Sequence, residues 1–142
     1  MAIKYSTQYD NAYNNGVKVG DGDINGRKKS MFAEFDLNGS AIATTDTVKM
    51  CTLPAGARVT EVTILTPTWG GAGSVDVGTA ADADAYFAAI TGVAQLNRMT
   101  DVITHAGIYS LTTVETEVLL TATVNTTATA GIVKVQIDYV LV

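Results

Sequence analysis

Apolar and polar side chains alternate with a period of two along most of the chain after residue 30. A period of two places successive side chains on opposite faces of a strand, whereas a helix needs a period near 3.6. The run 58–66 is rich in β-branched residues and stops at Pro67, as strands commonly do. In the run 132–142, one face is predicted to carry Val133, Val135, Ile137, Tyr139 and Leu141.

Residues that favour turns separate the alternating runs. The strands are predicted at 30–37, 47–53, 58–66, 74–79, 117–124 and 132–142. Asn38-Gly39 follows the first run and Pro54-Ala55-Gly56 follows the second, and both are turn signals. Several short strands between turns favour a β-sandwich or a barrel, and 142 residues suit a single domain.

One segment favours a helix. Residues 82–90 read Asp-Ala-Asp-Ala-Tyr-Phe-Ala-Ala-Ile, with Asp82 placed to cap the beginning and Gly92 placed to follow the end. The expected helix is short, about two turns.

The first 29 residues differ in composition from the rest. They are polar and contain few aliphatic residues, so they cannot bury enough apolar surface to order by themselves. We therefore divide the chain into an N-terminal arm, 1–29, and a globular body, 30–142. Tyr5, Tyr9 and Tyr13 recur every four residues in the arm. Either this spacing is chance in a flexible tail, or the tyrosines anchor the arm in grooves of a neighbouring subunit.

The charge is unevenly distributed. The net charge is −5, and seven of the nine basic residues lie at or before Arg58, so the body is acidic. An acidic body argues against nucleic-acid binding, which needs a basic face. The basic cluster Arg27-Lys28-Lys29 is either a solvated loop or a contact for an acidic partner. No run of about 18 apolar residues and no secretory signal is present, so we expect no membrane partner and folding in the cytoplasm of the producing cell.

The chain offers little for catalysis. A Cys–His or Ser–His mechanism would have to use His105, the single histidine, and Cys51 lies within an alternating run where a small apolar residue is ordinary. The carboxylate pairs Asp82/Asp84 and Glu115/Glu117 have the spacing of acid–base pairs, but a helix cap and a solvated strand start explain them. The sequence predicts no enzyme.

Neither a metal nor a cofactor is expected. Residues 21–26 match the first half of a calcium loop, but position 12 of that loop is Phe32 where a bidentate glutamate is needed. The glycines of 69–73 are not followed by the Lys-Ser/Thr of a phosphate-binding loop.

Three stretches carry a family resemblance: Leu53-Pro54-Ala55-Gly56-Ala57-Arg58-Val59-Thr60-Glu61-Val62-Thr63-Ile64, Val75-Asp76-Val77-Gly78-Thr79 and Asp82-Ala83-Asp84-Ala85-Tyr86. They resemble the small jelly-roll structural proteins of tailed bacteriophages that decorate or cement the head. The resemblance covers about residue 30 to the last residue. It implies an all-β, jelly-roll-like sandwich with one short helix and an extended arm. It also implies a homo-oligomer, dimer or trimer, on the capsid surface with the major capsid protein as its partner.

Three functional hypotheses follow. The first is a non-catalytic capsid decoration protein whose arm grips neighbours through Tyr5, Tyr9, Tyr13, Arg27, Lys28 and Lys29. The second is a carbohydrate- or receptor-binding jelly roll of a tail or fibre, with Trp69 and His105 in the ligand loops. The third, least favoured, is an enzyme that uses Asp82, Asp84 or His105.

Overall fold

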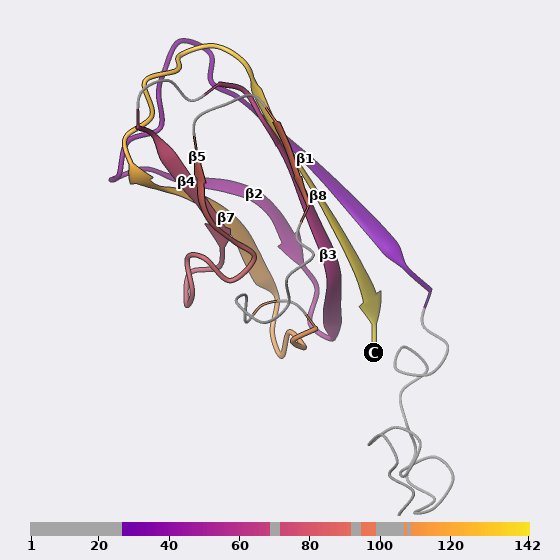
Figure 1. Ribbon diagram of the computed structural model, residues 1–142. Coiled ribbons are helices and arrows are strands. Elements are labelled where there is room, and N and C mark those ends of the chain that lie inside the picture. Colours follow the sequence, from indigo (N-terminus) through magenta and orange to yellow (C-terminus); the bar gives the residue numbers. More distant parts are fainter. Residues whose placement is uncertain (1–26, 69–71, 92–94, 99–106, 108) are drawn as a thin grey trace, which may run out of the picture.

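Two antiparallel β-sheets pack face to face in the computed structural model, which describes residues 27–68, 72–91, 95–98, 107 and 109–142 (Figure 1). The first, called the β1 sheet, has the strand order β1-β8-β3-β6, and the second, called the β2 sheet, has the order β2-β7-β4-β5. The strands are β1 (Lys29–Asp36), β2 (Thr47–Leu53), β3 (Ala57–Thr66), β4 (Ser74–Gly78), β5 (Phe87–Thr91), β6 (Gln95–Arg98), β7 (Thr116–Val124) and β8 (Ile132–Leu141).

The strands pair in a nested order. β1 pairs with β8, β2 with β7, β3 with β6 and β4 with β5, all antiparallel. The first strand therefore pairs with the last, and β4 and β5, which are consecutive in the middle of the series, pair with each other. Every connection between successive strands except β4 to β5 passes from one sheet to the other. This arrangement places β8 between β1 and β3, at the centre of the β1 sheet.

The core lies between the two sheets and follows the alternation of the sequence. Val133, Val135, Ile137 and Tyr139 of β8 are buried, as predicted, and Leu141 is half-buried at the margin. The largest fully buried side chains are Ile42, Leu53, Ile64, Leu120, Ile137, Val59, Val62, Val75, Val77, Val118 and Val133. Apolar burial at these positions is the main force that joins the sheets.

The six strands predicted from alternation are confirmed, each to within one residue at either end. The turn after β1 is also confirmed. Asn38 and Gly39 adopt φ values of 46° and 87°, the left-handed region that these two residue types tolerate best. Asp36 supports this turn, because its Oδ1 accepts a hydrogen bond from the Asn38 backbone N–H at 3.0 Å.

The predicted helix at 82–90 is wrong. Residues 82–86 form a turn and bend, and the following residues are strand β5. The turn is held by the Asp82 carbonyl, which accepts the backbone N–H of Thr79 at 2.8 Å. It packs directly on Gly78, where any Cβ would overlap the carbonyl oxygens of Asp82 and Ala83. No helix of the described ranges is long and apolar enough to cross a membrane.

The error at β5 has a physical cause. Phe87 and Ile90 are buried with two exposed residues between them, a spacing of three that fits a helix face as well as a bulged strand. The pairing of β4 with β5 is irregular between Val75 and Val77, and Ala89 has a φ of 51°. The Asp76 carboxylate stabilises this irregularity by accepting the Ala89 backbone N–H at 2.7 Å.

Candidate interaction surface

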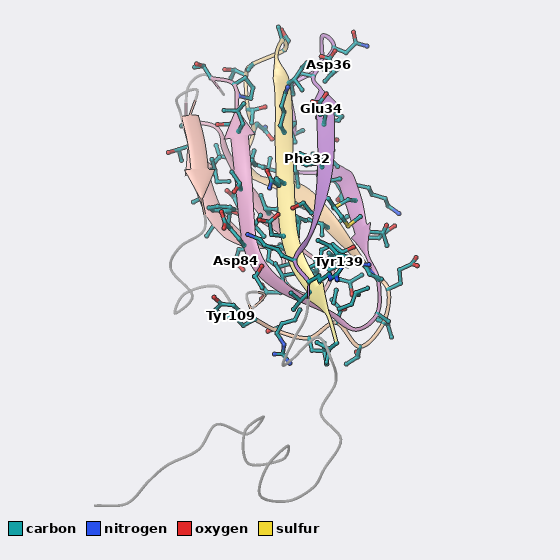
Figure 2. All side chains as sticks on the ribbon, turned by 90° about the vertical axis from the view of Figure 1, so that its right-hand side faces the viewer. Phe32, Glu34, Asp36, Asp84, Tyr109 and Tyr139 are labelled. Carbon is teal, nitrogen blue, oxygen red and sulfur yellow. The ribbon has the colours of Figure 1, made fainter. Side chains whose placement is uncertain are left out.

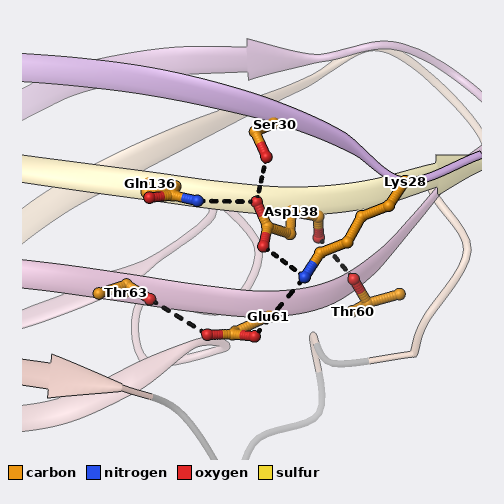
Figure 3. Close-up of polar contacts among 7 residues, drawn as sticks. All are labelled: Lys28, Ser30, Thr60, Glu61, Thr63, Gln136 and Asp138. Atoms are coloured by element: carbon orange, nitrogen blue, oxygen red, sulfur yellow. Dashed lines mark hydrogen bonds and ion pairs between the residues drawn. The ribbon is translucent and has the colours of Figure 1, made fainter.

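A buried carboxylate lies among polar side chains from three strands on the outer face of the β1 sheet (Figure 3). Asp138 of β8 stands opposite Ser30 of β1 on one side and Glu61 of β3 on the other. A bulge in β3 between Val59 and Glu61 sets this second register. Two carboxylates directly opposite each other on neighbouring strands repel, so the arrangement requires a cation.

Lys28 supplies that cation. Its Nζ lies 2.6 Å from Asp138 Oδ2 and 3.7 Å from Glu61 Oε2, and its side chain is 53% exposed. Asp138 Oδ1 also accepts hydrogen bonds from the Ser30 hydroxyl and from Gln136 Nε2, the latter at 3.1 Å. The Asp138 side chain is only 8% exposed, so these donors replace the water that the carboxylate loses.

The pKa values of this pair follow from the geometry. Burial raises the pKa of Asp138, but the hydrogen bonds from Lys28, Ser30 and Gln136 and the charge of Lys28 outweigh it, so the pKa falls below its ordinary value. The pKa of Lys28 is raised, because the hydrogen bond to Asp138 has a larger effect than partial desolvation, which lowers this pKa. Both groups are therefore charged at neutral pH, and residue 28 is fixed on the outer face of the sheet.

Sequence analysis did not identify this cluster. Glu61 and Asp138 each interrupt an apolar run, which marks them as facing outward, but their meeting depends on the β3–β8 register and its bulge. A single sequence shows charges and their spacings, whereas the register between neighbouring strands comes from the fold.

The same face carries an exposed aromatic side chain near the middle of β1. Phe32 is 75% exposed, and Leu65 on β3 is 41% exposed. Figure 2 faces this surface and places Phe32, Glu34 and Asp36 in succession along β1. Glu34 forms an ion pair with Lys134 at 3.2 Å. A shallow pocket on this face is lined by Phe32, Thr63, Leu65, Lys134, Val135 and Gln136.

A second exposed apolar group lies between β6 and β7 in the chain. Tyr109, Leu111 and Val114 are exposed, and the backbone around them is held by β3. Arg58 Nη1 donates to the Tyr109 carbonyl at 2.7 Å, and the Tyr109 backbone N–H donates to the Val59 carbonyl at 2.8 Å. Tyr109 thus projects from a fixed backbone with a φ of 58°.

Most of the predicted site residues lie outside the described residues. These are Tyr5, Tyr9, Tyr13, Trp69 and His105, so their assignment to an arm or to a ligand loop stays a prediction. Arg27 and Lys29 are exposed at the beginning of β1, and Lys29 pairs in register with Tyr139. Lys28 contacts the sheet through its side chain, which forms ion pairs with Asp138 and Glu61.

The residues considered for catalysis are dispersed. Cys51 is half-buried in β2, and burial raises the pKa of its thiol to about 11, which keeps it protonated. Glu117 of the Glu115/Glu117 pair forms an ion pair with Lys49 at 2.8 Å. Asp82 belongs to the turn against Gly78. Within the described part of the chain, no group of three His, Cys, Asp or Glu residues is placed to hold a metal ion.

Solved structures of phage capsids contain chains that are similar to this one. A chain in the capsid asymmetric unit of cyanophage Pam1 is 27% identical, with a TM-score of 0.65 over 84% of this chain and 88% of that one. A chain in the capsid of Ralstonia phage GP4 is 20% identical, with a TM-score of 0.64 over 84% of this chain and 88% of that one. A chain in the acidic stable capsid of Helicobacter pylori bacteriophage KHP30 is 16% identical, with a TM-score of 0.54 over 80% and 87%.

These likenesses differ in what they establish. Those to the Ralstonia and Helicobacter phage chains show a shared fold, and the likeness to the cyanophage chain adds sequence identity over most of both chains. No protein-family model and no curated protein matches the sequence. The chain is therefore an all-β sandwich similar to chains of phage capsid structures.

Proposed function

We propose that this chain is a bacteriophage virion structural protein that decorates or cements the capsid by binding the assembled lattice of the major capsid protein. The observation that carries the proposal is the likeness to the cyanophage Pam1 capsid chain, which extends over 84% of this chain at 27% identity. The protein would be made in the host cytoplasm and act on the capsid surface without catalysing a reaction.

The architecture supports this role. The nested pairing of eight strands in two sheets fits a jelly roll, a fold that recurs in viral capsid proteins. We infer that the sandwich is a jelly roll. A rigid sandwich can present fixed outer surfaces such as Phe32 on β1 and Tyr109 beside β3 to a partner. Fold alone does not define a function, so the proposal depends on binding to capsids.

The energetics of decoration explain why a non-catalytic sandwich would suffice. A protein that binds the assembled lattice more tightly than free subunits stabilises the lattice by mass action. Contacts of modest strength are enough when many copies, or several copies in one oligomer, bind together. An arm that becomes ordered on binding adds contact area at an entropic cost, which ties its binding to assembly.

We assign the gripping role to residues 1–29, with Tyr5, Tyr9 and Tyr13 as anchors and the cluster 27–29 as its base. Tyrosine buries a large area while losing few rotatable bonds, which suits an anchor. Because Lys28 bridges Asp138 and Glu61, the base of the arm is attached to the β1 sheet.

The test is binding to phage heads assembled without this protein. Full-length chain is added to purified heads, and the bound copies are counted after sedimentation. Deletion of 1–26 keeps Lys28 and β1, so we expect an unchanged circular dichroism spectrum and loss of head binding. Replacing Tyr5, Tyr9 and Tyr13 by serine should weaken binding at least tenfold.

Two results would count against the proposal in different ways. Full-length chain that does not bind heads removes the decoration role altogether. If the variant that lacks residues 1–26 binds heads as well as the full chain does, the proposed decoration role stands, but the role assigned to the arm is wrong.

A further inference from the structure

Strand β1 is the outer strand of its sheet and has an unusually regular edge. It pairs with β8 on one side, and no other strand of the described residues lies on its other side. Its eight residues pair with β8 without a register shift. Outer strands normally carry bulges or are short, which prevents unwanted pairing. The other outer strands follow this rule, because the pairings of β2 and β5 contain irregularities and β6 has four residues.

The flank that contains β1 is incompletely closed. Met31 and Phe35 of β1 and Val48 and Met50 of β2 pack against the core while remaining only partly buried. A pocket of 540 Å³ opens on this flank, with Phe35 and Val48 in its lining. An additional strand alongside β1 would cover this apolar margin and satisfy the backbone groups along the edge.

The outward-facing side chains of β1 are complementary to themselves in the antiparallel direction. In order they are Lys28, Ser30, Phe32, Glu34 and Asp36, counting the residue just before the strand. If a second copy pairs so that Phe32 faces Phe32, then Ser30 faces Glu34 and Lys28 faces Asp36 of that copy. Directly opposite residues lie on the same side of a sheet, so an aromatic pair forms together with an ammonium–carboxylate pair, in which Asp36 adds to the carboxylates that Lys28 already contacts. The Ser30 hydroxyl keeps its donation to Asp138 and places no like charge opposite Glu34.

Neighbouring registers lack this match. A shift of two residues in one direction places Phe32 opposite Glu34, and a shift in the other places Phe32 opposite Ser30. A shift of one residue would place the outer face of one sheet beside the inner face of the other. One register therefore combines a matched aromatic pair with complementary charges.

We propose that two copies of this chain associate through antiparallel pairing of their β1 strands, with the two-fold axis at Phe32. Their β1 sheets join into one continuous sheet. Phe32, which is 75% exposed in the single chain, becomes half of an aromatic pair at the centre of the interface. This association does not depend on whether the protein binds a capsid.

Disulfide trapping tests the register in the full-length chain carrying Cys51→Ala. Opposite residues have Cα atoms about 4.5–5.5 Å apart, within the range for a disulfide. Phe32→Cys should therefore form a covalent dimer under mild oxidation. Ser30→Cys and Glu34→Cys should each remain uncrosslinked, because each residue lies about 13 Å along the strand from its equivalent in the second copy. A mixture of those two variants should crosslink.

Charge substitution tests the interface without cysteine. Wild-type protein should sediment at twice the chain mass of 14.8 kDa. Phe32→Glu and Phe32→Lys each place like charges opposite each other and should sediment as monomers, and an equimolar mixture should recover the dimer. Because Phe32 is mostly exposed, both variants should keep the wild-type circular dichroism spectrum, and their melting temperatures should lie below that of the wild-type dimer only by the mass-action stabilisation that dimer formation adds.

Several results would overturn the proposal. The proposal is wrong if the wild-type chain sediments as a monomer or as a trimer. It is also wrong if the Phe32→Glu variant sediments as a dimer like the wild type. Crosslinking of Ser30→Cys alone, without crosslinking of Phe32→Cys, would refute the register and with it the self-complementary edge.

Discussion

Replacing Asp138 by asparagine tests whether the polar cluster on the β1 sheet stabilises the fold. The carboxylate is 8% exposed and accepts hydrogen bonds from Lys28, Ser30 and Gln136. A hydrogen bond to a charged group contributes about 1.5–3 kcal/mol and a neutral one about 1 kcal/mol. Asparagine keeps an acceptor for Ser30 and Gln136 but loses the ionic contact and the charge.

The net loss at pH 7 should be about 2 kcal/mol, because the neutral amide is cheaper to bury and the half-exposed Lys28 is screened by water. In urea the unfolding midpoint should fall by about 1 M, since chains of this size lose roughly 1–3 kcal/mol per molar urea. Glu61→Gln is the matched control. Glu61 is 3.7 Å from Lys28 Nζ and more exposed than Asp138, so its loss should stay below about 1 kcal/mol.

The pH dependence separates charge from packing. The pKa of Asp138 is lowered by folding, so its contribution is complete above the ordinary value of 3.8 and is lost as the pH falls through the folded-state pKa. The unfolding free energies of wild type and Asp138→Asn should therefore converge in acid, as the pH falls through the folded-state pKa of Asp138. Equal stability at pH 7, or a difference that does not shrink as the pH is lowered below 3.8, would refute the electrostatic explanation.

Three further predictions concern the sandwich itself. Gly78→Ala should lower the unfolding free energy by more than about 2 kcal/mol in thermal denaturation, because its Cβ would overlap backbone carbonyl oxygens of the following turn; an unchanged melting temperature would contradict the close packing. Leu120→Ala should cost about 3–4 kcal/mol in urea because the side chain is fully buried, whereas exposed Val124→Ala should change stability by less than about 0.5 kcal/mol; similar losses for both would argue against this core. Cys51 should react with a thiol reagent at pH 8 about 100-fold more slowly in the folded chain than in urea, because its pKa of about 11 leaves little thiolate; equal rates would contradict its burial.

The strands with a clear alternation could be predicted from the sequence. In β8 and β3 one face enters the core and the other faces solvent, so the apolar period reports the structure directly. The prediction failed at β5, where a bulge separates Phe87 and Ile90 by three positions and imitates a helix. It also missed β6, whose four residues are too few to show a period.

The interaction surface was less accessible to sequence reasoning. The basic cluster at 27–29 was identified, but its contact with Asp138 joins residues 110 positions apart and depends on strand order. The exposure of Phe32 likewise depends on which face of β1 covers the core. Residue spacing within one strand predicts which side chains share a face, whereas the fold decides which strands meet.

The central position of β8 has a consequence for biosynthesis. During translation, β1 and β3 leave the ribosome well before β8, the strand to which both of them are hydrogen-bonded. A nascent chain that has emerged only as far as residue 131 therefore exposes two unsatisfied strand edges and the apolar faces that β8 would cover. We expect the sandwich to close only after residue 141 has emerged, which makes this chain dependent on late, cooperative folding and sensitive to aggregation until then.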